Sequence, residues 1–177
     1  MLKGLEGTKC SSLPPVHKWK PPFCGDMDLV IKSNGDWIHE GCKINRPSMV
    51  KMFSRILWFE EGEYFLVTPV EKVRIQVEDA PFMIISWQWI NIDKGRAIEF
   101  RSHTDDIIIL GIDCDIWIAP FEGIERPYIS MRYGMKALIA RSAYYDLANE
   151  LETLNTLQGS GIGIISAGKS YVLMQDE

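Results

Sequence analysis

Residues 21–57 read PPFCGDMDLVIKSNGDWIHEGCKINRPSMVKMFSRIL, and this stretch decides how the first half of the chain folds. Residues 28–32 (DLVIK) and 37–40 (WIHE) are apolar-rich runs joined by Ser33-Asn34-Gly35-Asp36. An Asn-Gly pair between two such runs is the strongest short signal for a β-hairpin, because both residues tolerate a positive φ. The stretch therefore predicts a hairpin at its start.

A helix is predicted to follow this hairpin. Gly41 breaks the return strand, and Arg46 leads into Pro47, a residue that suits the first turn of a helix. The apolar residues beyond it recur at three- and four-residue spacing, which indicates an amphipathic helix. They are Met49, Val50, Met52, Phe53, Ile56 and Leu57.

The remaining segments add further strands. Residues 64–67 and 72–77 form a second predicted hairpin, and the run 78–81 (EDAP) marks a boundary. The strands expected beyond this boundary cover residues 82–91, 97–102, 107–112 and 115–119. The first half thus has the order strand, strand, helix, strand, strand.

A long helix is predicted over residues 131–154, where apolar side chains again recur at helical spacing. Gly134 near its start makes the first turns irregular. The glycine-rich run 159–163 ends it, and a small hairpin of residues 162–166 and 170–174 closes the chain. The order helix, glycine-rich loop, strand is the reverse of what a phosphate-binding loop requires, so nucleotide hydrolysis is not expected.

A short sequence motif occurs once in each half of the chain. Ile44-Asn45-Arg46-Pro47 recurs as Ile124-Glu125-Arg126-Pro127, each after a strand with Trp-Ile and before a predicted apolar helix. Coincidence is the alternative, since the match is short. Read as a duplication, it predicts an α+β fold of two similar subdomains, each made of antiparallel β-hairpins packed with one main helix. Residues 1–20 would form a tail with a proline strap, 21–80 the N-terminal subdomain, and 81–177 the C-terminal subdomain.

Composition excludes several classes of function. The chain has 177 residues, of which 46% are hydrophobic, and a net charge of −5 that opposes broad binding to nucleic-acid backbones. No run approaches the ~20 apolar residues that cross a bilayer, and the N-terminus lacks the apolar region of a signal peptide. We therefore expect a cytoplasmic protein without nucleic-acid or membrane partners.

The cysteines give no metal signature. Cys10, Cys24, Cys42 and Cys114 are widely spread and contain no C-x-x-C pair. In a reducing compartment such residues are most often plain buried thiols, which is the expectation for this chain.

Several runs resemble an uncharacterised bacterial family, domain of unknown function 1285. They are Pro22 to Asp28, Gly35-Asp36-Trp37, Arg46-Pro47, residues 68–73 (TPVEKV), residues 77–82 (VEDAPF) and Arg126-Pro127-Tyr128. The resemblance covers about residues 14 to 174, and the runs TPVEKV and DAPF are its specific parts. It implies a two-subdomain α+β fold with repeated structural motifs and suggests a part in signalling or ligand sensing. It implies no catalytic residues.

The acidic and histidine residues of the first hairpin raise the question of a metal or catalytic site. Asp26 and Asp28, two apart on a strand, would share a face and could hold a divalent cation with His39 or Glu40. The alternative is that Asp26 caps a loop and Asp28 starts the strand in solvent. Asp113 and Asp115 present the same choice. None of the three histidines lies in a triad signature, so a Ser-His-Asp or Cys-His mechanism has little support.

Arg46 and Arg126 are the main candidates for ligand contact. A guanidinium at a helix start could clamp a carboxylate or phosphate. The alternative is structural pairing, with Glu40 or Glu125. Glu71, Lys72 and Asp79 are expected near the seam between subdomains, where small-molecule sites usually lie.

The leading hypothesis is a non-enzymatic regulatory or sensing protein that binds a small anionic ligand or a protein partner between its two halves. It needs no cofactor and no metal, and a homodimer is left open. The alternative is a metal-dependent or hydrolytic enzyme that uses Asp26, Asp28 and His39.

Overall fold

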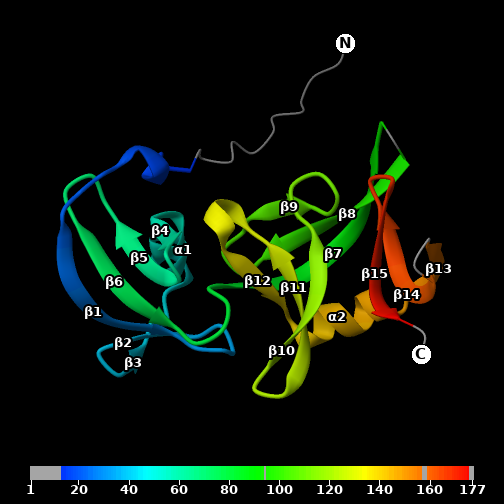
Figure 1. Cartoon of the computed structure of the whole chain (residues 1–177). Coiled ribbons are helices and arrows are strands. Elements are labelled where there is room, and N and C mark those ends of the chain that lie inside the picture. Colours follow the sequence, from blue (N-terminus) through cyan, green and yellow to red (C-terminus); the bar gives the residue numbers. More distant parts are fainter. Residues whose placement is uncertain (1–12, 94, 157–158, 176–177) are drawn as a thin grey trace, which may run out of the picture.

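The computed structural model describes residues 13–93, 95–156 and 159–175. Two six-stranded mixed sheets lie side by side, and a small three-stranded sheet lies at the far end of the second (Figure 1). The predicted tail falls mostly on residues 1–12, which lie outside the described residues. A proline-containing strap, residues 14–22, leads into the first sheet and contains the short 3-10 helix η1 (Val16–Lys18).

The N-terminal sheet is built from two three-stranded meanders. The first runs outward from the sheet centre, the helix α1 (Pro47–Arg55) crosses over, and the second runs back, so that β6 pairs with β1 in parallel. The strands are β1 Phe23–Ile31, β2 Trp37–His39, β3 Cys42–Lys43, β4 Leu57–Glu60, β5 Glu63–Val67 and β6 Lys72–Val77, in the order β3-β2-β1-β6-β5-β4. Both predicted hairpins of this half are present.

The C-terminal sheet repeats this path. Three strands run outward and three run back, and β12 pairs with β7 in parallel just as β6 pairs with β1. The strands are β7 Phe82–Ile92, β8 Gly95–Ser102, β9 Ile107–Ile109, β10 Ile116–Phe121, β11 Ile124–Ser130 and β12 Lys136–Ile139, in the order β10-β11-β12-β7-β8-β9. The coarse prediction of two similar α+β units is therefore right, but each sheet has a parallel pair at its centre.

The predicted helix over residues 131–154 is wrong. The segment forms the 3-10 turn η2 (Arg132–Gly134), strand β12, the helix α2 (Arg141–Ala148) and strand β13 (Glu152–Thr156). Tyr133 and Gly134 both have positive φ, which no α-helix accommodates. Burial alternates along β12, with Ala137 and Ile139 buried, as a strand requires, although Met135, Leu138 and Ile139 have helical spacing.

The predicted equivalence of Arg46 and Arg126 is also wrong. Arg46 precedes α1, which lies in the connection between the two meanders, whereas Arg126 lies within β11, opposite Ala119 of β10. By its place in the repeated path, β11 corresponds to β5. Pro127 is tolerated in this strand because pairing with β12 begins only at Tyr128. The first half of β11 is thus left as an open edge.

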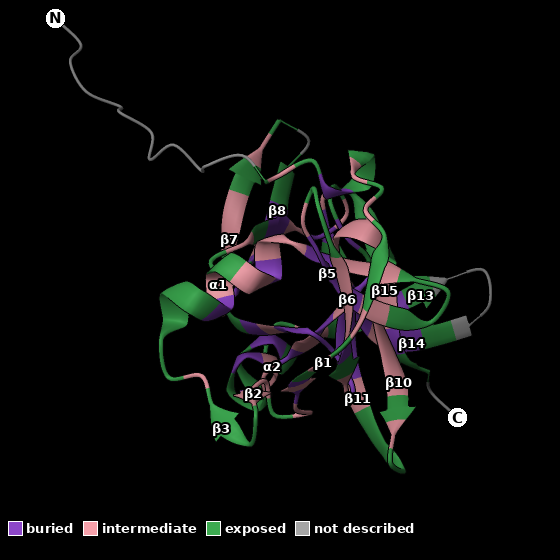
Figure 2. Ribbon diagram, turned by 90° about the vertical axis from the view of Figure 1, so that its left-hand side faces the viewer, coloured by how far each residue is buried: buried purple, intermediate pink, exposed green. Residues whose placement is uncertain are grey.

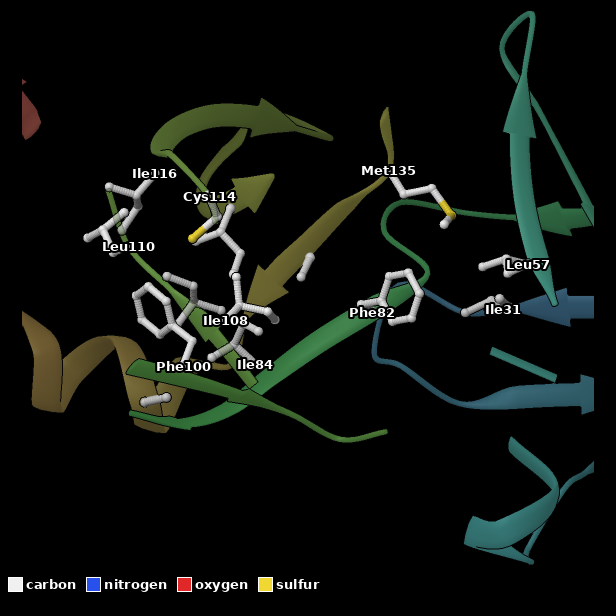
Figure 3. Packing of buried hydrophobic residues seen from close by; sticks show 14 of the residues in the cluster. Ile31, Leu57, Phe82, Ile84, Phe100, Ile108, Leu110, Cys114, Ile116 and Met135 are labelled. Carbon is white, nitrogen blue, oxygen red and sulfur yellow. The ribbon is translucent and has the colours of Figure 1, made fainter. Parts of the chain in front are cut away.

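One hydrophobic core runs through both sheets. Ile31 and Leu57 of the N-terminal sheet belong to the same buried cluster as Phe82 and Met135 of the C-terminal part, as Figure 3 shows. Phe82 is 1% exposed and Met135 2%, so the boundary between the domains is dry at this point. In Figure 2 the buried segments gather towards the middle of the molecule, and exposed residues lie on the outer loops.

The third sheet consists of β13, β14 (Gly159–Ser166) and β15 (Lys169–Gln175), so the predicted closing hairpin is present. It is fastened to the second sheet by the buried Ser166 hydroxyl, which accepts the N–H of Ile98 at 2.9 Å and donates to the carbonyl of Leu110 at 2.7 Å. Close packing of the strands explains a glycine in the run 159–163. A Cβ on Gly163 would lie 2.0 Å from the carbonyl oxygen of Tyr171.

The cysteine prediction is right for Cys114, which is buried, and wrong for Cys24 and Cys42, which are exposed. Cys10 lies outside the described residues. No described helix has the length and apolar character needed to span a membrane.

Candidate functional site: the seam between the domains

A buried carboxylate lies at the seam between the two domains. Asp79 follows β6, and its side chain is 0% exposed. An ionised carboxylate in such a place is costly unless it is paired and hydrogen-bonded. The partners of Asp79 all come from the other domain: Arg126 and Tyr128 on β11, and Lys136 at the start of β12.

These partners satisfy both carboxylate oxygens. Nη1 of Arg126 donates to Oδ2 at 3.0 Å, and Nζ of Lys136 donates to Oδ1 at 2.9 Å. The Tyr128 hydroxyl lies 2.9 Å from Oδ1 and 2.8 Å from Oδ2 and donates to the carboxylate. Arg126 and Tyr128 are two apart on one strand and so share its face. Two cations on one carboxylate leave an excess of positive charge at the seam.

Asp79 affects the pKa values of two tyrosines. Burial, and next the hydrogen bond to Asp79, raise the pKa of Tyr128 well above its ordinary value. Burial and the nearby charge of Asp79 also raise the pKa of Tyr64 to about 12. Both phenols therefore stay protonated at neutral pH, and the Tyr128 hydroxyl remains a donor to the carboxylate.

A second contact fastens the seam on the α1 side. Arg132 of η2 donates to Oδ1 of Asp106 at 2.7 Å and to the carbonyl of Ser54 in α1 at 2.9 Å. Its guanidinium lies 4.6 Å from the centre of the Phe82 ring. The side chain thus joins α1 of one domain to the β8–β9 loop of the other.

A cleft of about 520 Å³ opens on the seam next to the Asp79 network. Its walls come from the β1–β2 turn of the N-terminal domain and from β11, the end of β12 and the start of α2 in the C-terminal domain. The lining residues are Ser33, Asn34, Met83, Ile124, Glu125, Arg126, Pro127, Leu138, Ile139, Ala140, Arg141, Tyr144 and Tyr145. This volume is within the range of small-molecule sites.

The cleft combines an apolar body with cationic groups. Its apolar side chains include the buried Ile139, while Ile124 and Tyr145 at the rim are 60% and 62% exposed. Arg126 is held in place by Asp79 and by the Phe121 ring, 4.5 Å from its guanidinium carbon. Arg141 is exposed and forms no ion pair with any residue that the structure describes. Such a surface suits a ligand with an apolar part and a negative charge.

The structure brings together only two of the predicted site residues, Arg126 and Asp79. Lys72 begins β6, so the five residue steps of that strand, about 16 Å in all, separate it from the Asp79 end. Its ammonium pairs with Glu60. Glu71 lies in the β5–β6 turn, where its N–H donates to Oγ1 of Thr68 at 3.1 Å. The position of Arg46 is exposed and does not line the cleft.

The residues of the alternative enzyme hypothesis do not form a metal site. Nε and Nη2 of Arg74 donate to the two oxygens of Asp26 at 2.7 and 3.1 Å, and this pairing holds the pKa of Asp26 below its usual range. Among the described residues, no group of three or more His, Cys, Asp or Glu side chains is placed to hold a metal ion. Asp113 and Asp115 have structural partners: Asp113 accepts the N–H of Ile109 close by in the chain, and Asp115 accepts the hydroxyl of Tyr171 on β15.

Sequence reasoning missed Tyr128, Lys136 and Arg141 as site residues. Lys136 and Arg141 lay inside the predicted helix 131–154, which hid their places at the start of β12 and at the start of α2. A signal for Tyr128 was available, because Arg126 and Tyr128 alternate with Pro127, and alternation indicates a strand.

Both halves of the chain match models of a known protein family. Residues 14–80 match the N-terminal domain of DUF1285, a domain of unknown function, and residues 81–173 match the C-terminal domain of the same family. The chain belongs to the DUF1285 family. The resemblance seen in the sequence is thus confirmed, and the family's description assigns no activity.

Solved DUF1285 structures share this fold. The crystal structure of a DUF1285 family protein from Silicibacter pomeroyi DSS-3 superposes with a TM-score of 0.84 at 38% identity, over 94% of this chain and 90% of that one. One from Shewanella baltica OS155 gives a TM-score of 0.58 at 28% identity, over 71% of this chain and 94% of that one. No curated protein shows a significant match to the chain.

Proposed function

We propose that this DUF1285 chain is a binding protein of the regulatory or sensing kind. In this proposal it holds a small organic anion with an apolar body in the cleft between its domains. The observation that carries the proposal is the joint placement of Arg126 and Arg141 on a largely apolar cleft of about 520 Å³. A guanidinium offers several fixed donors to a carboxylate or phosphate, and the apolar wall gains from contact with a hydrocarbon part.

Binding rather than catalysis is favoured by what lines the cleft. The lining residues that the structure describes include neither His nor Cys, and Glu125 is their one carboxylate. General acid–base and nucleophilic mechanisms usually pair such groups within hydrogen-bond reach. A cleft with two arginines and one acid is better suited to holding an anion than to transferring protons.

A regulatory role is supported by the cleft's position. A ligand there would touch the β1–β2 turn of one domain and β11 and α2 of the other. It would therefore favour one arrangement of the two domains over others, by its differential affinity for them. A protein partner that presents an acidic group beside apolar side chains would satisfy the same chemistry, and the cytoplasmic location predicted from the sequence is part of this proposal.

Thermal unfolding with graded carboxylates tests the proposal. We expect octanoate to raise the midpoint in a concentration-dependent way, as any ligand of the native state does, and acetate and octylamine to fail because each lacks one half of the required chemistry. Stabilisation by octylamine as strong as that by octanoate, or none by any carboxylate, would exclude an organic-anion site.

A further inference from the structure

A second cavity, of about 340 Å³, lies between the strap (residues 14–22) and the edge strand β4 of the N-terminal sheet. The strap is anchored there by a small core of its own. Val16, which is 2% exposed, packs with Phe65 and Val67, apart from the main core, and Trp19 and Trp58 pack against this group. The cavity therefore has a fixed floor and two indole walls.

The polar residues of this cavity carry more positive than negative charge. Its lining residues are Val16, His17, Trp19, Lys20, Pro21, Trp58, Glu60, Val67 and Lys72. Lys72 pairs with Glu60, which cancels the one acid, and its ammonium lies 4.1 Å from the centre of the Phe65 ring. Lys20 forms no ion pair within the part of the chain that the structure describes, so its charge is uncompensated.

The two indole rings differ in their contacts. Trp58 lies against Tyr133, with ring centres 4.9 Å apart, and Tyr133 is held there with a φ of 57°, which non-glycine residues rarely adopt. Trp19 has no aromatic ring contact within the described residues, and its side chain is only partly buried. Part of the Trp19 side chain is therefore exposed in the cavity beside an uncompensated cation, as in sites that stack a planar ligand and hold its charge.

We infer that this cavity binds a small planar aromatic anion: one ring system, stacked on Trp19, with a phosphate or carboxylate held by Lys20. The volume lies at the lower end of the range for small-molecule sites, which fits a mononucleotide or a smaller molecule rather than a dinucleotide. The site shares no lining residue with the cleft between the domains, so it stands independently of the function proposed above.

The test uses adenosine monophosphate and indole-3-acetate as probes, because they present the same chemistry from two sources. Binding to the full chain is measured by calorimetry, with quenching of tryptophan fluorescence as a second readout. Lys20→Ala is the test variant and Lys18→Ala the matched control, since both lysines are exposed on the same strap and only Lys20 lines the cavity. Neither change removes a buried side chain, so both variants should fold.

We expect at least one probe to bind saturably, to lose about tenfold in affinity in Lys20→Ala, and to keep its affinity in Lys18→Ala. Adenosine, which lacks the charge, and inorganic phosphate, which lacks the ring, should each bind more weakly than the nucleotide. The inference is overturned if neither probe binds saturably, if the two variants behave alike, or if phosphate alone binds as tightly as the nucleotide.

Discussion

Asp79 and Arg126 meet across the boundary between the two domains, with Oδ2 of the carboxylate 3.0 Å from Nη1 of the guanidinium. The two side chains differ in exposure: that of Asp79 is fully buried, whereas that of Arg126 is 23% exposed and also lines the cleft. One residue of the pair thus holds the domains together, and the other places its charge at the wall of the cleft.

Removing the buried partner should be costly. Asp79→Ala leaves Arg126, Lys136 and Tyr128 without their shared acceptor, and we expect the free energy of unfolding to fall by about 3 kcal/mol. Urea unfolding measures this directly. Glu78→Ala is the matched control, because the neighbouring acid is exposed, where it pairs with Lys32 and accepts the N–H of Ser33, and its loss should cost about 1 kcal/mol. Equal losses of unfolding free energy in the two variants would show that the Asp79 network stabilises the fold no more than the surface contacts of Glu78 do.

The pH dependence of stability should contain a component from His103. Burial lowers the pKa of His103 below its ordinary value of 6.5, and Nδ1 accepts the N–H of Met83 at 3.1 Å. Below pH 6.5 the unfolded chain therefore binds more protons at this site than the folded chain does. Stability should be complete above pH 6.5 and fall as the pH drops toward the folded pKa.

Urea unfolding between pH 5 and 7.5 measures this component. His103→Asn retains an acceptor for Met83 and removes the titrating group, so it should flatten the slope below pH 6.5. An unchanged slope in His103→Asn would assign the pH dependence to other groups.

The cysteines should differ sharply in reactivity. Burial, with the charges of Asp113 and Asp115, raises the pKa of Cys114 to about 12, so almost no thiolate forms at neutral pH. Cys24 and Cys42 are exposed. In a Cys10→Ser background, a thiol reagent at pH 8 should label two groups rapidly and a third only after unfolding. Rapid labelling of all three would contradict the burial of Cys114.

The third sheet should not tolerate a side chain at Gly163. A Cβ there would lie 2.0 Å from the carbonyl oxygen of Tyr171 and 2.8 Å from a methyl carbon of Leu154, so the strands would have to move apart. We expect Gly163→Ala to lower the free energy of unfolding by roughly 3 kcal/mol. Ile165→Ala on the same strand removes an exposed side chain and should cost about 1 kcal/mol or less. A Gly163→Ala protein as stable as the parent would refute the close approach of β14 and β15.

The sequence predicted local structure well where turn chemistry marks it. The Asn34-Gly35 turn, the Pro47 helix start and the β5–β6 hairpin all appear as expected, because each depends on residues a few positions apart. Residues 131–154 were mispredicted because Met135, Leu138 and Ile139 satisfy helical spacing, while Ala137 and Ile139 satisfy strand alternation. Pairing with β7, a long-range contact, decides between the two.

The candidate site was predictable only in part for the same reason. Arg126 and Asp79 were both singled out from the sequence, but no local pattern joins residues that are 47 positions apart. The repeated Arg-Pro motif instead indicated Arg46 as the partner of Arg126 in the site. What repeats between the two halves is the order in which the chain forms the six strands of each sheet. The two arginines occupy different places in that order.

We propose above that the cleft at the seam binds an organic anion through its arginines. Calorimetric titration of octanoate into three proteins, the parent chain, Arg141→Ala and Arg46→Ala, tests it most directly, because both arginines are exposed at helix starts and only Arg141 lines the cleft. We expect about tenfold weaker binding in Arg141→Ala and unchanged binding in Arg46→Ala. Equal affinities in all three proteins, or no binding to the parent chain, would contradict it.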